Sequence, residues 1–201
     1  MGRDKALLRI DGDTLVELAL GKLRSLGLDP RICGSRPDLA QFAGVVEDHF
    51  AQAGPLAGLE AALAHSDSDL NLFVPVDLPD VPEEFLRWLM TRAERTRAVA
   101  TIPRYGDRDQ PLCAVYSRRL LQGLRKALAA GDHKVMVAIG ESAAALGERI
   151  DRFDVECVAA SGALDCALGT ETAGWFHNVN TPADYETLEQ AAGAKSRHPI
   201  S

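Results

Sequence analysis

An aspartate at the end of an apolar run is the residue in this sequence that is best placed to do chemistry. Asp77 follows the run NLFVPV at residues 71–76 and precedes Leu78 and Pro79. A continuous apolar run is typical of a strand buried on both faces, and open α/β sheets bind ligands at the carboxyl ends of such strands. A carboxylate there suits Mg²⁺, which keeps waters and takes phosphate oxygens as further ligands. Asp77 could equally cap the turn before Pro79.

Two asparagines near the carboxyl end form a second candidate group. Asn178 and Asn180 are separated by one residue, so on an extended segment both side chains project from the same face. They would then point together into a cleft, toward a metal ion or a phosphate. Turn and capping chemistry, in which asparagine is also common, is the alternative role.

Two glycines and a lysine are further candidates, but their residue types alone do not distinguish a phosphate-binding role from a structural one. Gly54 and Gly58 frame a predicted helix start at Pro55, where free N–H groups and the helix dipole favour an anion. The same glycines could instead allow a close approach between helix and sheet. Lys5 stands in the opening segment MGRDK, where a basic side chain is commonly just solvated.

Five segments, taken in order, make the sequence similar to a known family. They are MGRDK at residues 1–5, GPLAG at 54–58, PVDLP at 75–79, QPLCAVY at 110–116 and NVNTPAD at 178–184. Their order and spacing resemble the molybdenum cofactor guanylyltransferases, which are nucleotidyltransferases with a Rossmann-like fold. The segment KVMV at 134–137 is also similar to that family, and the resemblance covers roughly residues 1–188.

The resemblance implies roles for individual residues. It places the magnesium-binding aspartate at Asp77 and the triphosphate-binding lysine at Lys5, and these two would be the catalytic residues. It places a nucleotide-contacting acid at Asp48, whose carboxylate could accept from the guanine edge or from a ribose hydroxyl. Gly54 would lie at the nucleotide as part of the GPLAG segment. Ser35 stands near a position where the family usually has an asparagine that contacts the nucleotide, which puts base selectivity in question.

The reaction implied by the resemblance is transfer of GMP from GTP to the molybdopterin form of the molybdenum cofactor, with Mg²⁺ as cofactor and pyrophosphate as product. Such a transfer depends on positioning and charge neutralisation. The attacking phosphate is already an anion, so no dedicated general base is required. GTP, the molybdenum cofactor and recipient molybdoenzymes would be the partners. A cytidylyltransferase acting on the same pterin, or a sugar-phosphate nucleotidyltransferase, is the alternative enzyme.

The sequence departs from the family at its beginning. The family signature is a strand followed by a glycine-rich loop, L-A-G-G-x-S-x-R-M-G-x-D-K, and this sequence begins at the methionine within it. The loop would cradle the triphosphate, and the strand before it would lie within the sheet. We expect that the start is misplaced, because the downstream motifs all suit catalysis. The alternative is a non-catalytic domain that binds nucleotide or cofactor.

The elements that must position these residues alternate between strand and helix. Helices are predicted over 14–26, 55–65, 82–92, 119–130, 134–139 and from 181 onward, and strands over 31–33, 45–46, 71–76, 98–102 and 113–116. The alternation predicts an α/β fold with a mainly parallel sheet. The resemblance implies a Rossmann-like three-layer sandwich, similar to the nucleotide-diphospho-sugar transferases. We expect one domain over residues 1–192 and a flexible tail at 193–201.

The composition of the sequence indicates which classes of partner are disfavoured and which cellular compartment is expected. The 201 residues include 22 Lys and Arg against 29 Asp and Glu, a net charge of −7, which disfavours nucleic acid and anionic membranes as partners. No apolar run is long enough to span a bilayer, and the charged start does not resemble a signal peptide. The cysteines lack the spacing of a metal site or a disulfide framework; they are Cys33, Cys113, Cys157 and Cys166. We therefore expect a cytoplasmic protein with reduced, mostly buried thiols.

Overall fold

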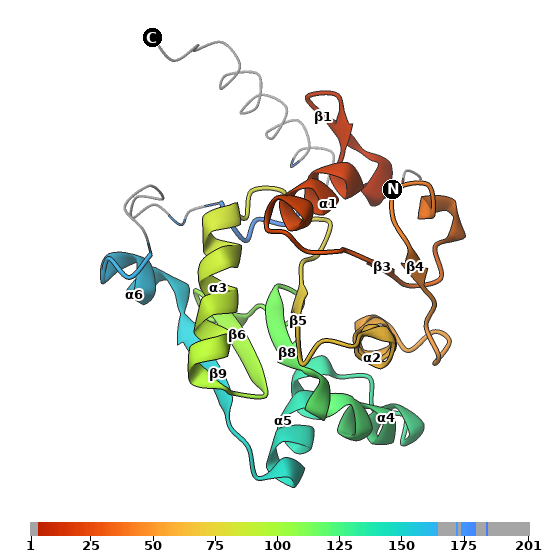
Figure 1. Ribbon diagram of the computed structural model, residues 1–201, viewed down its shortest axis with the longest axis vertical. Helices are drawn as coiled ribbons and strands as arrows, with labels where there is room; N and C mark the ends of the chain where they lie inside the picture. The colour runs from red at the N-terminus through yellow and green to blue at the C-terminus, as the bar shows by residue number, and fades with distance from the viewer. Residues whose placement is uncertain (1–3, 165–171, 173, 180–183, 185–201) are drawn as a thin grey trace.

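The computed structural model describes residues 4–164, 172, 174–179 and 184, and within them helices cover both faces of a central sheet (Figure 1). The helices are α1 (Leu15–Ser25), α2 (Pro55–His65), α3 (Glu83–Thr96), α4 (Leu121–Ala129), α5 (Val135–Leu146) and α6 (Val155–Ala160), with 3₁₀ turns η1 (Lys5–Leu7), η2 (Pro37–Leu39) and η3 (Arg118–Leu120). The strands are β1 (Arg9–Ile10), β2 (Asp13–Thr14), β3 (Ile32–Cys33), β4 (Val45–Val46), β5 (Leu70–Phe73), β6 (Ala100–Tyr105), β7 (Arg108–Asp109), β8 (Ala114–Ser117) and β9 (Ile150–Asp154).

The sheet is mixed, so the prediction of a mainly parallel sheet is wrong. The five-stranded sheet has the order β5-β8-β6-β7, and β9 also pairs with β6. Strand β8 runs antiparallel to both β5 and β6, whereas β9 is parallel to β6. No helix separates β6 from β8; the chain turns back through the short strand β7, and such a hairpin reverses the strand direction where a helical crossover would preserve it.

Two hydrophobic cores lie on opposite faces of this sheet and make the α/β fold three-layered. One core packs α2, α4 and α5 against Ala114 and Tyr116. The other packs α3 and α6 against Cys113 and Val115. The alternation along β8 follows from the period of two in a strand, which sends successive side chains to opposite faces. Both faces of β8 are therefore buried.

Local signals placed the first two long helices close to their observed bounds. Thr14 accepts a hydrogen bond from the Glu17 N–H, and the Glu17 side chain bonds back to the Thr14 backbone, which is a capping box. Pro55 is the first residue of α2, where its missing N–H leaves no intrahelical bond unmade. Helices α3 and α5 run four and seven residues beyond their predicted ends, and the predicted last helix lies almost wholly outside the described residues.

An open groove separates the strand pair β3-β4 from the five-stranded sheet. Strand β3 pairs only with β4, and β5 pairs only with β8, so each has an edge without a strand partner among the described residues. The groove between these edges has a volume of about 680 Å³ and is lined by α1, α2, β3 and β5. Figure 1 shows β3 and β5 apart, with α1 and α2 beside the gap. Residues 70–77 are only half-buried, which corrects the expectation of a strand covered on both faces.

Two of the three described cysteines depart from the expected burial. Cys113 is buried, but Cys33 and Cys157 are exposed; Cys166 lies outside the described residues. Cys33 is the last residue of β3, with its Cβ beside Gly58 of α2, and Cys157 lies within α6. Among the described helices, none has both the length and the apolar character needed to cross a membrane.

Candidate active site

Three predicted site segments meet around one valine. Val76 packs against two small hydrophobic clusters, one of which contains Ala6, the residue after Lys5, and the other Val179, the residue after Asn178. Asp77 is the next residue after Val76. The contacts between these apolar neighbours bring Lys5, Asp77 and Asn178 into one region of the molecule, although 173 positions separate the first from the last.

Asp77 lies in the loop that follows β5 and is half-buried. Its backbone carbonyl accepts a hydrogen bond from the Val179 N–H at 3.0 Å, which fixes the exposed Asn178 beside it. Among the described residues the Asp77 carboxylate makes no hydrogen bond or ion pair, so the turn-capping role receives no support. Asn180, the second predicted asparagine, lies outside the described residues.

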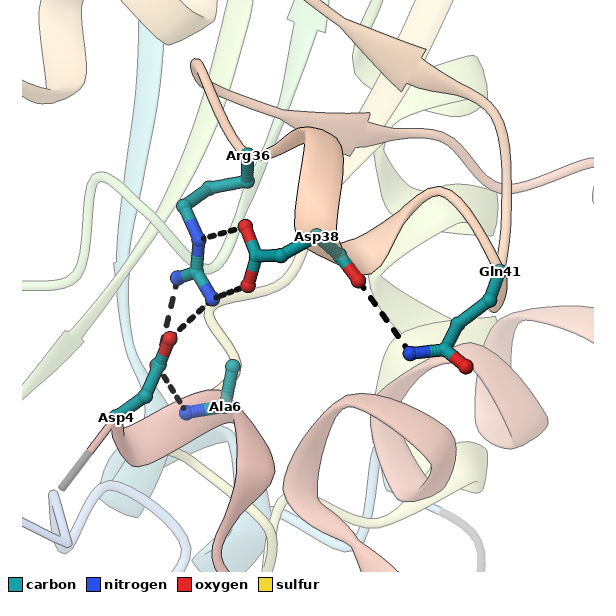
Figure 2. A network of polar contacts seen from close by, with 5 residues as sticks. All are labelled: Asp4, Ala6, Arg36, Asp38 and Gln41. Carbon is teal, nitrogen blue, oxygen red and sulfur yellow. Dashed lines mark hydrogen bonds and ion pairs between the residues drawn. The ribbon is translucent and has the colours of Figure 1, made fainter.

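The loop after β3 is tied to the first turn of the chain by an arginine. Arg36 binds Asp4 and Asp38 through its guanidinium group, and the Asp4 carboxylate also accepts from the Ala6 N–H (Figure 2). The guanidinium lowers the pKa of Asp38 below its ordinary value. Ser35, which precedes Arg36 and is exposed, is thereby held near the turn that carries Lys5.

Asp48 follows β4 and rests against α2. Its Oδ1 atom is buried and has no hydrogen-bond partner among the described residues. A Cβ placed on Gly58 would lie 3.6 Å from that oxygen. Burial raises the pKa of Asp48, the nearby Glu60 carboxylate raises it further, and His49 opposes the rise. A buried carboxylate oxygen without a donor is costly, and it is an acceptor available to a ligand.

The two glycines of the GPLAG segment have different structural roles. Gly54 is exposed and precedes α2 with φ +66°, a conformation that glycine adopts without strain. It opens the first turn of a helix of eleven residues, whose free N–H groups point toward the loop. Gly58 lies against Asp48 and Cys33, so the close-approach explanation holds for Gly58.

The residues around Asp77 fit a magnesium ion that is bound mainly by its substrate. Among the described residues, no three His, Cys, Asp or Glu side chains lie close enough to form a metal cluster. Mg²⁺ commonly takes one or two carboxylates and completes its shell with waters and phosphate oxygens. A single carboxylate without a protein partner matches that donor set.

Two residues at this region were not predicted from the sequence. Arg36 joins Asp4 across 32 positions, and Glu60 is completely buried on α2 while bonded to His49 and Arg125. A glutamate within an otherwise apolar helix, LAGLEAALA, is the signal that could have marked Glu60, because a buried charge requires partners. The sequence offered no comparable signal for Arg36.

Solved structures of other proteins share this architecture. The chain is similar to the crystal structure of molybdopterin-guanine dinucleotide biosynthesis protein A from Archaeoglobus fulgidus, with a TM-score of 0.76 and 24% identity over 96% of this chain and 92% of that one. It is also similar to 2-C-methyl-D-erythritol 4-phosphate cytidylyltransferase from Thermus thermophilus, with a TM-score of 0.64 and 18% identity over 94% of each chain. At these identities the likeness shows the fold.

The family follows from sequence comparison. The model of the MobA-like NTP transferase domain matches residues 1–146, and the chain belongs to that family. It is 28% identical over 192 residues to molybdenum cofactor guanylyltransferase of Vibrio vulnificus (strain YJ016), covering 94% of this chain and 88% of the relative. It is 30% identical over 186 residues to the probable molybdenum cofactor guanylyltransferase of Pelotomaculum thermopropionicum, covering 92% and 83%.

Proposed function

We propose that this protein transfers GMP from GTP to the phosphate of the molybdopterin form of the molybdenum cofactor and hands the dinucleotide product to recipient molybdoenzymes. The observation that carries the proposal is a pair of carboxylates, Asp77 and Asp48, each in the loop after a strand and each with an oxygen that no described protein group satisfies. The relatives named guanylyltransferases align over most of the chain.

The two carboxylates suit different parts of the nucleotide. Asp77 would hold Mg²⁺, which supplies charge neutralisation at the phosphates when bound. Asp48 is an acceptor of the kind that guanine, with its adjacent N1–H and N2–H₂ donors, requires. The physical difference supports this division: Asp48 is desolvated and beside α2, whereas Asp77 is half-buried in the loop after β5, next to Val76, which lines the groove.

The remaining residues would position phosphates and offset their charge. Lys5 supplies a compact ammonium group suited to the departing pyrophosphate. The first turn of α2, after Gly54, presents N–H groups to an anion. Asn178 and Asn180 would add amide donors beside Asp77, and Ser35 a hydroxyl beside the nucleotide. No side chain is needed as a general base, because the attacking phosphate is already an anion.

Calorimetric titration with GTP, CTP and ATP in the presence of Mg²⁺ tests the proposal most directly. We expect GTP to bind at least tenfold more tightly than CTP or ATP, because the Asp48 carboxylate would accept hydrogen bonds from the two adjacent N–H donors of guanine. Equal affinity for the three nucleotides would contradict the guanine assignment, and tighter binding of CTP would support a cytidylyltransferase. Folded protein that binds none of them would contradict the nucleotidyltransferase role and support a non-catalytic domain.

A further inference from the structure

A completely buried glutamate links three elements beside Asp48. Glu60 lies in α2 with 0% exposure. Its Oε2 atom is 2.9 Å from His49 Nδ1, in the loop that carries Asp48, and its Oε1 atom accepts from Arg125 Nε of α4 at 2.7 Å. Both carboxylate oxygens are thus engaged, as a buried charge requires.

The loop that Glu60 holds is fixed by one side-chain hydrogen bond and by Phe50, which packs against the core beside α2. Residues 47–52 form no helix or strand, and the only hydrogen bond recorded for the described side chains of this loop is that between His49 and Glu60. The Asp48 side chain itself has a buried oxygen without a partner. Its placement against Gly58 and Cys33 therefore depends on its neighbours in the loop rather than on bonds of its own, and His49 is the neighbour that supplies a hydrogen bond.

We propose that Glu60 is a positioning residue, which through His49 holds Asp48 against α2 in the place where it accepts the N–H groups of the base. The inference rests on the proposed function for the identity of the base. Its structural part does not depend on that function, because the position of Asp48 is measurable without nucleotide. Arg125 holds one oxygen of the Glu60 carboxylate in place, so that the other oxygen faces His49.

Four substitutions distinguish loss of the contact between Glu60 and His49 from a general destabilisation of the fold. Glu60→Gln removes the negative charge and leaves one amide oxygen, which Arg125 needs, so the link to His49 loses its charged acceptor and is weakened. His49→Ala breaks the link from its exposed end, since the His49 side chain is 54% exposed, and so spares the core. His49→Gln keeps a donor for Glu60. Glu148→Gln breaks a more exposed glutamate–arginine pair, with Arg119, which joins neither the loop nor α2, and is the control for loss of such a pair elsewhere in the fold.

The thiol of Cys33 reports where Asp48 lies. Desolvation by the surrounding atoms raises the pKa of Cys33 to about 11, and the Asp48 carboxylate contributes to the rise. Alkylation by iodoacetamide at pH 8 depends on the thiolate fraction and is followed by mass spectrometry, with the exposed Cys157 as internal reference. Asp48→Asn should speed alkylation of Cys33 several-fold. Glu60→Gln and His49→Ala should speed it similarly, and His49→Gln and Glu148→Gln should leave it unchanged.

Two outcomes of this measurement would overturn the proposal. If Asp48→Asn speeds alkylation but Glu60→Gln and His49→Ala do not, Asp48 keeps its place without the link. If Asp48→Asn itself has no effect, Asp48 does not lie against Cys33 and the geometry behind the proposal is wrong. Alkylation that is faster in every variant, including Glu148→Gln, reflects general loosening and also contradicts a specific positioning role.

Base discrimination provides the functional readout. Inosine triphosphate lacks the 2-amino group of GTP, and loss of one hydrogen bond to a charged acceptor weakens binding about ten- to a hundredfold. We expect Glu60→Gln and His49→Ala to reduce this GTP-to-ITP ratio of affinities several-fold, whereas a merely structural defect weakens both nucleotides equally. An unchanged ratio with altered Cys33 alkylation means that Asp48 is positioned by Glu60 but does not contact the 2-amino group, which overturns the functional half of the inference. Absence of GTP binding by the wild-type protein contradicts the proposed function and leaves the alkylation result to decide the structural half.

Discussion

Asp77 and Asp48 are both aspartates in loops after strands, but their surroundings differ in a way that fits the different roles proposed for them. The Asp77 carboxylate stands in a half-buried loop without a protein partner among the described residues, as a carboxylate that shares Mg²⁺ with phosphates should. Asp48 is desolvated and close to another carboxylate, which raises its pKa. The first arrangement favours a hydrated cation and the second favours neutral N–H donors.

Replacing Asp77 with alanine should abolish most of the catalytic rate. We expect turnover to fall by about two to three orders of magnitude, because one principal electrostatic element of the transfer is lost. Steady-state assays with GTP, molybdopterin and saturating Mg²⁺ measure this. Asp80→Ala is the matched control, since Asp80 is exposed three residues further on. Turnover of Asp77→Ala near the wild-type value would exclude Asp77 from metal binding.

Replacing Asp48 with asparagine should weaken function while stabilising the fold. The pKa of Asp48 is raised above its ordinary 3.8 in the folded protein, so ionisation favours the unfolded state and the free energy of unfolding falls as pH rises through that pKa. Asp48→Asn removes this loss, so the variant should be more stable than wild type at pH 7. Its affinity for GTP should fall about ten- to a hundredfold.

Urea denaturation at pH 7 and at pH 3 checks the sign of the effect. The stability advantage of Asp48→Asn should be present at pH 7 and should shrink at pH 3, where the wild-type carboxyl is protonated in both states. A variant that is less stable than wild type at pH 7 would show that the Asp48 carboxylate is satisfied in the folded protein, contrary to its buried, unpartnered oxygen.

At the scale of elements, helix starts were predictable and strand direction was not. Thr14 with Glu17 and Pro55 define the starts of α1 and α2 by chemistry within one turn. The reversal at β8 depends on the hairpin between β6 and β7, which is formed by polar residues that carry no apolar pattern. Strand β9 has the sequence IDRFD, which contains no apolar run from which a strand could be predicted. Likewise Asp77 could be predicted from its place after a strand, whereas the Arg36 bridge required the folded path of the chain.

Gly123 of α4 lies so close to α5 that a methyl group at this position would disrupt the contact between the two helices. A Cβ on Gly123 would come within 2.5 Å of the Ser142 Cβ and 3.0 Å of its Cα, and a backbone atom cannot easily move aside. We expect Gly123→Ala to reduce the free energy of unfolding by about 1–3 kcal/mol, measured by urea denaturation.

Gly140 in α5 is the control for this contact. Nothing lies within 4 Å of a Cβ placed there, so Gly140→Ala should increase stability by about 0.5–1 kcal/mol through the backbone entropy of the unfolded chain. If Gly123→Ala is as stable as Gly140→Ala, the two helices are further apart than the structure shows.

Among the described residues, the strand pair β3-β4 and the five-stranded sheet are joined without backbone-to-backbone hydrogen bonds. No backbone-to-backbone hydrogen bond between described residues runs from residues 4–49 to residues 70–164. The contacts across the groove are apolar packing around Val76 and side-chain bonds such as those from Lys22 Nζ to the carbonyls of Pro79 and Val81. The strand pair β3-β4 is therefore connected to the five-stranded sheet only loosely, and it packs mainly against α2.

Amide hydrogen exchange should show two levels of protection. Regions with few shared bonds open at lower free energy than the global fold, so the amides of β3 and β4 should exchange at least about tenfold faster than those of β6 and β8. Exchange measured by NMR or mass spectrometry on the protein without nucleotide tests this. Uniform protection of all four strands would mean that the groove does not divide the fold.

This division has a consequence for how the protein responds to its nucleotide. Lys5, Ser35 and Asp48 belong to the segment before the groove, and Asp77 and Asn178 to the part beyond it. A ligand that touches both parts is a cross-link, and each local opening that separates them must first release it. Nucleotide should then slow exchange in β3 and β4 far more than in β6 and β8, so that the substrate completes a cooperative unit that the polypeptide forms only loosely by itself.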